Sequence, residues 1–308
     1  MRPLVIALLL TLVTQEAARA ARGVGPVKVA PAAADSITAA YQKDRTDTEK
    51  QLKDGATSYL AAVARTDFAD KPALVLGRAA DCDLRVDDPE VAAHHLRVTV
   101  AGDSFRVEAI DDTAHFLVRG ETQRSATLTP GFVRVGRFTV RLSHQRYPAL
   151  IVFDPKSKHF ADYHGLSWYA PDFAYRFVAP LTPDPAADTT IIMSTRGNAR
   201  RAVMAGWFDL VVGGKPVRLE AHRLLEPGVD EKSVSIFFRD ATTGSETYSV
   251  GRYLDPEPLP DGEWLVDFNN CYNPACATSP YYNCPIPSKA NTLKVAIRAG
   301  EKDSHYSH

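Results

Sequence analysis

The stretch LRVTVAGDSFRVEAI (Leu96–Ile110) decides the fold class. Apolar and polar residues alternate on both sides of Ala101–Ser104, and a period of two is typical of strands that bury one face. The Gly-Asp pair in the middle is a turn signal, and turn residues between two alternating runs indicate a hairpin. The stretch therefore predicts two antiparallel strands joined by a tight turn.

The same alternation recurs along the rest of the chain, without helical periodicity between the runs. We therefore predict a mainly all-β protein with two β units. The first is a small unit over residues 72–147. The second is a larger antiparallel, barrel-like domain over residues 148–302, in which a meander closes as a barrel or folds as a sandwich. Its expected strands are WFDLVV (207–212) and VRLEAHRLL (217–225) around Gly213-Gly214, VSIFFRD (234–240) and TYSVGRY (247–253) around Ala241–Glu246, then EWLVDF (263–268) and LKVAIRA (293–299).

The N-terminus resembles an export signal. Arg2 is followed by the apolar run LVIALLLTLV (Leu4–Val13), which is too short to span a membrane, and Ala18 and Ala20 are small residues where a signal peptidase cleaves. We expect residues 1–20 to be a signal peptide and the protein to be exported, to the periplasm or outside the cell. No second long apolar run follows, so we expect no stable membrane span.

Between the signal and the first β unit the composition changes twice. Residues 21–35 are rich in alanine, proline and glycine and are interpreted as a linker. Residues 36–71 are mostly charged with few large apolar positions, which favours one or two surface helices that end before Pro72. Residues 303–308 are a short tail.

The charge balance argues against nucleic acid as a partner. The chain has 36 Lys and Arg against 37 Asp and Glu, a net charge of −1. Its basic residues are scattered rather than gathered with aromatic residues, as binding of single strands requires. We therefore expect no nucleic-acid binding.

Three of the four cysteines lie in DFNNCYNPACATSPYYNCPIPSKAN (Asp267–Asn291), the most specialised stretch of the chain. In an exported protein, close cysteines are first interpreted as disulfides, and we predict a Cys276–Cys284 bridge. Zinc sites favour cysteines two to four residues apart, whereas Cys271, Cys276 and Cys284 are separated by five and eight with no histidine between them. We expect no metal and no cofactor, although a cysteine-based metal or redox site remains an alternative. Cys271 is then unpaired, and Cys82 is assigned to the core of the first unit.

Polar residues of the second domain are the candidate ligand-binding site. If their strand faces turn inward, two carboxylates and two arginines meet beside the uncharged amides and phenols of the stapled loop. Three alternatives stay open: an Arg239–Glu246 salt bridge that fixes strand register, asparagines that only cap turns, and a metal-independent hydrolase with Asp267 or Glu246 as base. Whether the protein is an enzyme is undecided. The candidates are Arg239, Glu246, Tyr248, Arg252, Asp267, Asn269, Tyr272, Asn273 and Asn291.

LVLGRAADCDLRVDDPEVAAHHLRVTV (Leu74–Val100) resembles the start of a forkhead-associated domain, and LTPGFVRVGRFTVRL (Leu128–Leu142) resembles its last hairpin. The resemblance implies a β-sandwich. Members of that family hold phosphothreonine with a serine, an arginine and an asparagine, at positions that carry Ala92, Ala93 and Ala114 here. Alanine cannot donate a hydrogen bond to phosphate. Of the phosphate-binding set only Arg78 remains, so we expect no phosphothreonine recognition, and we expect His95 to hold the sandwich together.

A second resemblance covers most of the remaining chain. It is carried by YHGLSWY (163–169), FFRDATTGSETYSVGRYL (237–254) and the block from Asp267 to Lys302. These motifs are similar to the bacterial family catalogued as domain of unknown function 1684, which often has a degenerate forkhead-associated-like segment ahead of its signature. The family implies a fold but no activity. The leading hypothesis is therefore binding of a small polar ligand or a partner protein through a pocket in the second domain.

Overall fold

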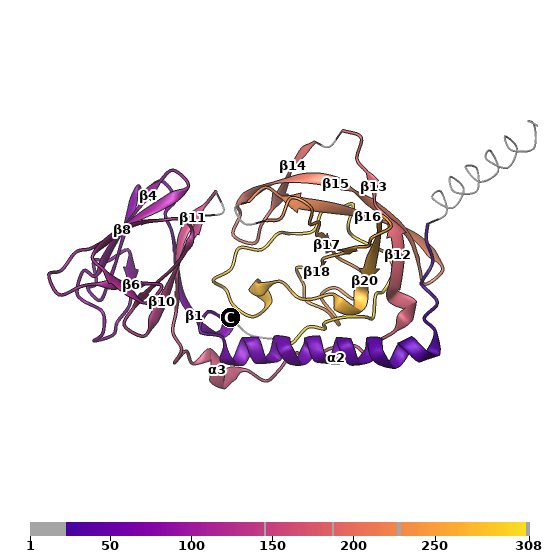
Figure 1. The fold of residues 1–308 in the computed structure, drawn as a ribbon, viewed down its shortest axis with the longest axis horizontal. Helices are drawn as coiled ribbons and strands as arrows, with labels where there is room; N and C mark the ends of the chain where they lie inside the picture. The colour runs from indigo at the N-terminus through magenta and orange to yellow at the C-terminus, as the bar shows by residue number, and fades with distance from the viewer. Residues whose placement is uncertain (1–22, 145, 187, 227–228, 306–308) are drawn as a thin grey trace, which may run out of the picture. The chain divides into compact units, whose positions relative to one another are not determined.

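The computed structural model describes residues 23–144, 146–186, 188–226 and 229–305. The predicted signal peptide and the last residues of the tail lie outside this part of the chain. Within it, no helix is both long and apolar enough to cross a membrane. The chain divides into two compact units (Figure 1). The first contains residues 46–165 and 278–283, and the second contains residues up to 45, 166–277 and 284–307.

The first unit is a sandwich of a six-stranded and a five-stranded sheet, as the resemblance to a forkhead-associated domain implies. Since β1 pairs with β11, the sandwich extends beyond the predicted bounds of 72–147 at both ends. The six-stranded sheet has the order β1 (Ala62–Asp67), β11 (Pro148–Phe153), β10 (Phe138–His144), β9 (Gly131–Val135), β6 (Phe116–Val118) and β7 (Glu121–Gln123). The other sheet has the order β3 (Leu84–Arg85), β2 (Ala73–Gly77), β4 (Leu96–Ala101), β5 (Ser104–Ala109) and β8 (Ser125–Leu128).

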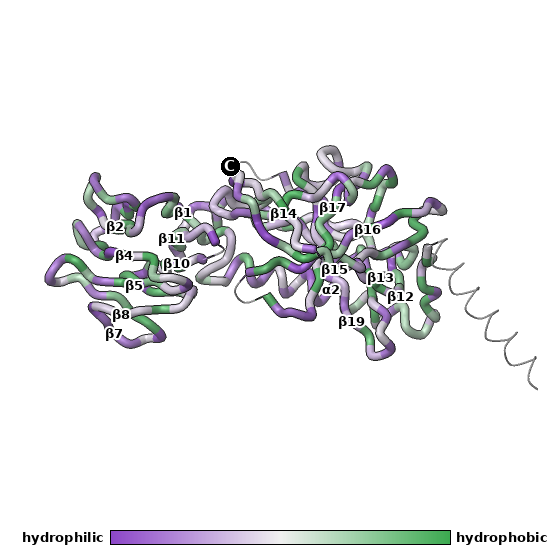
Figure 2. The backbone as a smooth tube through the Cα atoms, turned by 90° about the horizontal axis from the view of Figure 1, so that it is seen from above, coloured by the Kyte–Doolittle hydropathy of each residue, from purple (hydrophilic) through white to green (hydrophobic). Residues whose placement is uncertain are grey.

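The alternating residues of β4 and β5 build the sandwich core as the sequence predicts. Ala101 pairs with Ser104 across the turn, which confirms the hairpin. Leu96 and Val98 of β4 are buried with their neighbours Phe105 and Val107 of β5. Along these strands the backbone changes between hydrophobic and hydrophilic residues over short distances (Figure 2). The strands therefore bury one face each, which is what a two-layered sandwich requires.

His95 joins two loops at one end of this sandwich, in keeping with the holding role that the sequence suggested for it. Its Nδ1 accepts from the backbone N–H of Ala92 at 2.9 Å, so Nε2 carries the proton and donates to the carbonyl of His115 at 2.8 Å. Burial lowers the pKa of His95, because the charged imidazolium would lose its hydration. The neutral ring thus accepts a hydrogen bond from one loop and donates one to the other.

The His95 connection should make the sandwich sensitive to mild acid. A histidine whose pKa is lower in the folded state stabilises the fold at pH values above its unfolded pKa of about 6.5. As the pH falls below that value, the unfolded chain takes up the proton first, so the stabilisation is lost. We therefore expect the sandwich to lose stability as the pH falls below about 6.5. An NMR titration of the imidazole signals measures this directly, and a His95 that titrates at or above 6.5 would contradict the assignment.

Among the described residues, one α-helix precedes the sandwich, which agrees with the prediction of one or two. Helix α2 (Pro31–Asp54) begins inside the predicted linker and ends well before Pro72. A short 3₁₀ turn at Tyr59–Ala61 leads directly into β1, in the region that the composition had suggested was helical. Strand β1 has no alternating pattern, because Ala62 is buried and the five residues after it are all partly buried, so a period of two does not reveal it.

The second unit consists of several small sheets. Strands β15 and β16 form the long hairpin predicted around Gly213-Gly214, with Val212 paired to Lys215. No sheet of the described residues closes on itself, so the expected barrel is not found. The sheets are β12 (Arg176–Pro180), β20 (Glu263–Asp267) and β19 (Glu257–Pro258); β13 (Thr182–Pro183), β14 (Thr189–Met193), β15 (Ala199–Val212) and β16 (Lys215–Leu224); and β17 (Ile236–Phe238) with β18 (Arg252–Leu254).

Three predicted strands of this unit, VSIFFRD, TYSVGRY and LKVAIRA, are largely or wholly irregular. Only Ile236–Phe238 and Arg252–Leu254 pair, and the residues between them form turns. The run LKVAIRA has no strand at all, and the chain beyond Asp267 is drawn as coil with short turns (Figure 1). Even so, Leu293, Val295, Ile297 and Ala299 are buried in the core around Phe238 and Phe268. The alternation in that run therefore reflects burial of one side of an extended segment without a ladder of hydrogen bonds.

Candidate functional site

Arg252 is the most deeply placed charge of the second unit, with 1% of its surface exposed. It is the first residue of β18, and its guanidinium points into the core beside the Phe238 ring, 5.3 Å from the ring centre. Nη1 donates to the carbonyl of Ala299 at 2.5 Å, and Nη2 donates to the carbonyl of Ile297 at 2.7 Å. The side chain therefore replaces strand hydrogen bonds for the extended segment that follows residue 292.

Asp240 completes this network. Its Oδ2 accepts from the backbone N–H of Ile297 at 2.6 Å and from Arg252 at 3.3 Å. Its Oδ1 accepts from the hydroxyls of Thr242 and Thr243 at 2.7 and 3.1 Å. A buried ion pair is tolerated where further hydrogen bonds satisfy both groups, and these contacts do so for the carboxylate. Sequence reasoning missed Asp240, although it directly follows Arg239 in the signature.

Asp267 forms a second buried network at the end of β20. The carboxylate is 2% exposed, accepts from the Tyr41 hydroxyl at 2.5 Å and forms an ion pair with Arg176. Its other oxygen accepts from the backbone and side-chain nitrogens of Asn269 at 3.1 and 2.9 Å. Burial and the neighbouring carboxylate raise the pKa of Tyr41, so the phenol keeps the proton that it donates. Asp267 and Asn269 thus lie close together as predicted, but their polar atoms form hydrogen bonds within the protein.

Two of the five asparagines in Asp267–Asn291 clamp backbone segments together. Asn269 accepts from the N–H of Asp172 at 2.8 Å and donates to its carbonyl at 2.9 Å. Asn291 does the same with Glu220, at 2.8 and 2.9 Å, and donates also to the carbonyl of Phe237 at 2.9 Å. An amide that pairs with a peptide in both directions imitates a strand partner. These contacts join irregular segments to the sheets.

Glu246 and Arg239 do not pair with each other. Glu246 forms a bidentate pair with Arg298, at 2.6 Å for the closest atoms, and accepts from the Tyr169 hydroxyl at 2.9 Å. These donors lower the pKa of Glu246 to about 2, and burial beside the carboxylate raises the pKa of Tyr169 to about 12. Arg239 instead donates to the carbonyl of Val250 at 2.9 Å, within the turn region between β17 and β18.

The remaining candidates are Tyr248, in the turn region before β18, and Tyr272 and Asn273, on the loop that starts after η3 (Phe268–Asn270). Tyr248 donates to the carbonyl of Cys276 at 3.0 Å, and the partly exposed Tyr272 donates to Asp255 at 2.8 Å. The backbone and side-chain nitrogens of Asn273 donate to the carboxylate of Glu301, at 2.8 and 2.9 Å. Each of these polar groups thus contacts a different part of the unit, and the structure distributes the candidates over several contacts.

The four cysteines are thiols in this structure. Cys276 and Cys284 are both buried and lie side by side, with Cys284 Sγ 3.3 Å from the backbone nitrogen of Cys276. Hydrogen bonds from Cys284, Tyr248 and Thr195 lower the pKa of Cys276. Cys271 is fully buried in the apolar core, which raises its pKa. Cys82 is only half-buried and donates to the carbonyl of Ala93 at 3.3 Å, so it lies at the edge of the sandwich core rather than in it.

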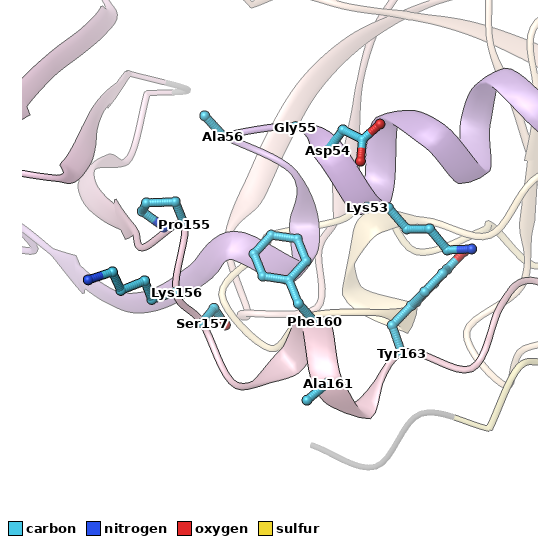
Figure 3. Close-up of a pocket in the computed structure, with 10 residues that line it drawn as sticks. All are labelled: Lys53, Asp54, Gly55, Ala56, Pro155, Lys156, Ser157, Phe160, Ala161 and Tyr163. Atoms are coloured by element: carbon cyan, nitrogen blue, oxygen red, sulfur yellow. The ribbon is translucent and has the colours of Figure 1, made fainter.

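A groove in the first unit was not anticipated from the sequence. It has a volume of about 550 Å³ and lies between the end of α2 and the segment that contains α3 (His159–Asp162). Figure 3 shows the Phe160 ring in the middle, Lys53 reaching toward Tyr163 on one side, and Lys156 on the other. Lys53 lies 3.6 Å from Glu49, which also accepts from the Tyr163 hydroxyl at 2.5 Å. Scattered positions such as these give no motif, because the two lining segments are about a hundred residues apart in sequence.

The models of two protein families match two parts of the chain. The model described as an FHA domain matches residues 74–133, and the model described as "Protein of unknown function (DUF1684)" matches residues 161–302. No curated protein matched the chain.

Several solved structures are similar to parts of the chain. The FHA domain of FhaA, solved with the intracellular domain of another protein, is 19% identical over 26% of this chain and 78% of that chain, with a TM-score of 0.20. EmbR of Mycobacterium tuberculosis, solved with a low-affinity phosphopeptide, is 17% identical over 41% of this chain and 32% of that chain, with a TM-score of 0.21. Values this low carry no argument about ligands.

One solved structure is more similar in sequence. An uncharacterised protein of Haloarcula marismortui is 32% identical over 49% of this chain and 83% of that chain, with a TM-score of 0.39. Together with the family match over residues 161–302, this shows that the chain belongs to the DUF1684 family of proteins of unknown function, with an FHA-like domain ahead of the family's signature.

Proposed function

We propose that this protein is a non-catalytic binding protein and that its ligand is a small organic anion with an apolar body, held in the groove beside Phe160. One observation carries the proposal. The groove combines an aromatic floor with a lysine on each side and has a volume of about 550 Å³. Sites for small molecules typically measure about 300–1,000 Å³ and are mainly apolar with a few polar groups.

The two lysines have different roles in this proposal. Lys53 already has Glu49 as an ionic partner and stacks against the Tyr163 ring, with the ammonium 5.4 Å from the ring centre. Lys156 is exposed on the other side of the groove and is assigned to the anionic group. Phe160 would contact the apolar body of the ligand. The ligand thus differs from the uncharged polar molecule expected from the C-terminal asparagines.

The internal networks of the second unit support a binding role over hydrolysis. A general base works best with a pKa near the operating pH, and Glu246 with a pKa of about 2 is a weak base at neutral pH. Asp267 has its oxygens occupied by Tyr41, Arg176 and Asn269, which leaves it poorly placed to take a proton from water. Alanine at positions 92, 93 and 114 supports a role without phosphothreonine.

The groove can be tested with the anionic aromatic dye 1-anilinonaphthalene-8-sulfonate, whose fluorescence rises on binding. We expect saturable binding to the folded protein. Replacing Phe160 by alanine removes an aromatic contact worth about 1 kcal/mol and should weaken binding about fivefold. Lys156→Glu should weaken it at least as much, because it places a like charge beside the sulfonate.

Lys50→Glu is the matched control, because Lys50 is exposed on α2, the helix that ends at the groove, but does not line the groove. Its dye affinity should stay within twofold of the wild type. Melting curves show whether each variant is folded. Equal affinity in the Lys156 and Lys50 variants, with both folded, would remove the support for this groove.

We also propose that the protein is exported and that Cys276 and Cys284 form a disulfide there. The adjacent buried thiols support the pairing, and the leader sequence supports the compartment. Oxidation by a disulfide-exchange catalyst would remove two electrons and two protons. Closing this short loop would stabilise the protein by about 2.5 kcal/mol on the chain-entropy model.

A mass spectrum of protein purified from the cell envelope tests both statements. We expect the mass of a chain that begins at Ala21. This mass should be about 2 Da lower than that of the same chain with reduced cysteines, because one disulfide forms with the loss of two hydrogens. Peptide mapping should place the bridge between Cys276 and Cys284. A full-length mass in the cytoplasmic fraction, or free thiols at both positions in exported protein, would contradict the proposal.

A further inference from the structure

Three metal-ligating side chains of different chemistry meet at one end of the sandwich. A carboxylate oxygen of Asp81, the sulfur of Cys82 and an imidazole nitrogen of His94 all lie within 4.8 Å of one another. The Nε2 atom of His94 faces both carboxylate oxygens of Asp81, at 3.0 and 3.1 Å. These residues are outside the groove and outside the networks of the second unit.

The two loops that carry these residues are fastened together by their backbones. Asp81 and Cys82 lie between β2 and β3, and His94 lies just before β4. The N–H groups of Arg78 and Ala79 donate to the carbonyls of Ala92 and Ala93, at 2.9 and 3.0 Å. The cluster therefore has a fixed frame, and only short side chains need to move.

Gly77 makes this close approach possible. A Cβ at position 77 would lie 2.2 Å from the carbonyl oxygen of Ala93 and 2.8 Å from Cys82 Sγ, distances that side-chain carbons do not adopt. Any larger residue would push the two loops, and with them Cys82 and His94, apart. The absence of a side chain at Gly77 thus allows the two loops to pack closely and allows Cys82 Sγ to lie near the His94 ring.

We propose that Asp81, Cys82 and His94 bind a divalent transition-metal ion of the zinc class. Thiolate, imidazole and carboxylate are the ligands that zinc takes in proteins, and three protein ligands leave one position open for water or another ligand. At zinc–ligand distances of about 2.0–2.3 Å, tetrahedral ligand atoms are about 3.5 Å apart, so Cys82 Sγ has to move in by up to about 1 Å while the Asp81 and His94 atoms, now 3.0 Å apart, separate slightly. Binding releases the Cys82 thiol proton to solvent, and His94 coordinates as the neutral ring.

The surrounding charges favour a cation at this position. Asp83 and Asp111 both act electrostatically on Cys82, in addition to Asp81. The side chain of Asp111 accepts from the backbone N–H of His94 at 3.1 Å, which holds the backbone of that loop and adds a negative charge near the cluster. A His94–Asp81 ion pair accounts for two of the three residues, and the Cys82 thiol, which donates to the carbonyl of Ala93 at 3.3 Å, would exchange that hydrogen bond for the metal.

The test is titration of the metal-free protein with Co²⁺ and then with Zn²⁺. We expect one Co²⁺ per chain at this site, with a near-ultraviolet thiolate-to-cobalt charge-transfer band that Zn²⁺ abolishes. Cys82→Ser should remove the band, and Cys82→Ser and His94→Ala should each weaken zinc binding at least about 100-fold. His115→Ala is the control, because His115 is an exposed histidine of the same unit outside the cluster, and it should bind zinc within twofold of the wild type.

Three outcomes would overturn the site. Wild-type protein could show no saturable binding below millimolar Co²⁺. The charge-transfer band could survive in Cys82→Ser and disappear in Cys276→Ser, which would assign the thiolate to the other unit. His94→Ala and His115→Ala could weaken binding equally. Melting curves without metal confirm that each variant is folded.

Discussion

Replacing Arg252 by alanine should lower the free energy of unfolding of the second unit by about 3–5 kcal/mol, the largest effect expected for a single change in this protein. The substitution leaves the Asp240 carboxylate without its counter-charge and leaves the carbonyls of Ile297 and Ala299 without a donor, all in the interior. Unpaired buried groups of this kind cost more than the interaction itself contributes. Urea denaturation followed by circular dichroism measures the change.

Arg218→Ala is the matched control for this prediction. Arg218 pairs with Asp209 across the β15–β16 hairpin, and 59% of its side chain is exposed. Surface pairs contribute about 0–1 kcal/mol, so the control should change stability by no more than that. If both arginine variants had the same small effect, Arg252 would not hold the unit together.

Asp267→Ala is the second large change, with an expected cost of about 3 kcal/mol or more. It removes the acceptor of Tyr41 and the counter-charge of Arg176. It also frees the amide of Asn269, which then loses part of its hold on the chain before β12. Denaturation curves should show a lower midpoint with the same slope, as expected when the fold is kept and stability is lost.

Asp209→Ala provides the corresponding control, since that carboxylate pairs with Arg218 on the surface. It should cost no more than about 1 kcal/mol. A catalytic role for Asp267 would give a different pattern, in which Asp267→Asn keeps nearly full stability because active-site charges are often unfavourable for folding. A more stable Asp267→Asn variant would therefore contradict the structural role argued here.

The sequence predicted the sandwich well because its signals are local. The alternation in Leu96–Ile110 is read within one hairpin, and both the pairing and the buried residues agree with it. The long β15–β16 hairpin was predicted for the same reason, from two glycines between alternating runs. Strand β1 was missed because its partner, β11, is about eighty residues away.

The candidate site was harder to predict because alternation does not distinguish a strand from an extended segment. LKVAIRA alternates, yet its hydrogen bonds go to Arg252 and Asp240 rather than to a neighbouring strand. The polar residues were recognised as unusual, but their partners Tyr41 and Arg176 lie far away in sequence with no motif of their own. A group that satisfies a distant buried partner looks the same in sequence as a group that awaits a ligand.

An NMR titration of isotopically labelled protein with 1-anilinonaphthalene-8-sulfonate tests binding in the groove most directly, because it locates binding residue by residue. We expect the largest amide shifts at Gly55, Ala56 and Ala161, which line the groove, and little change at Tyr248, Asn273 and Asn291. Shifts concentrated at those three C-terminal residues, with the groove unaffected, would contradict it.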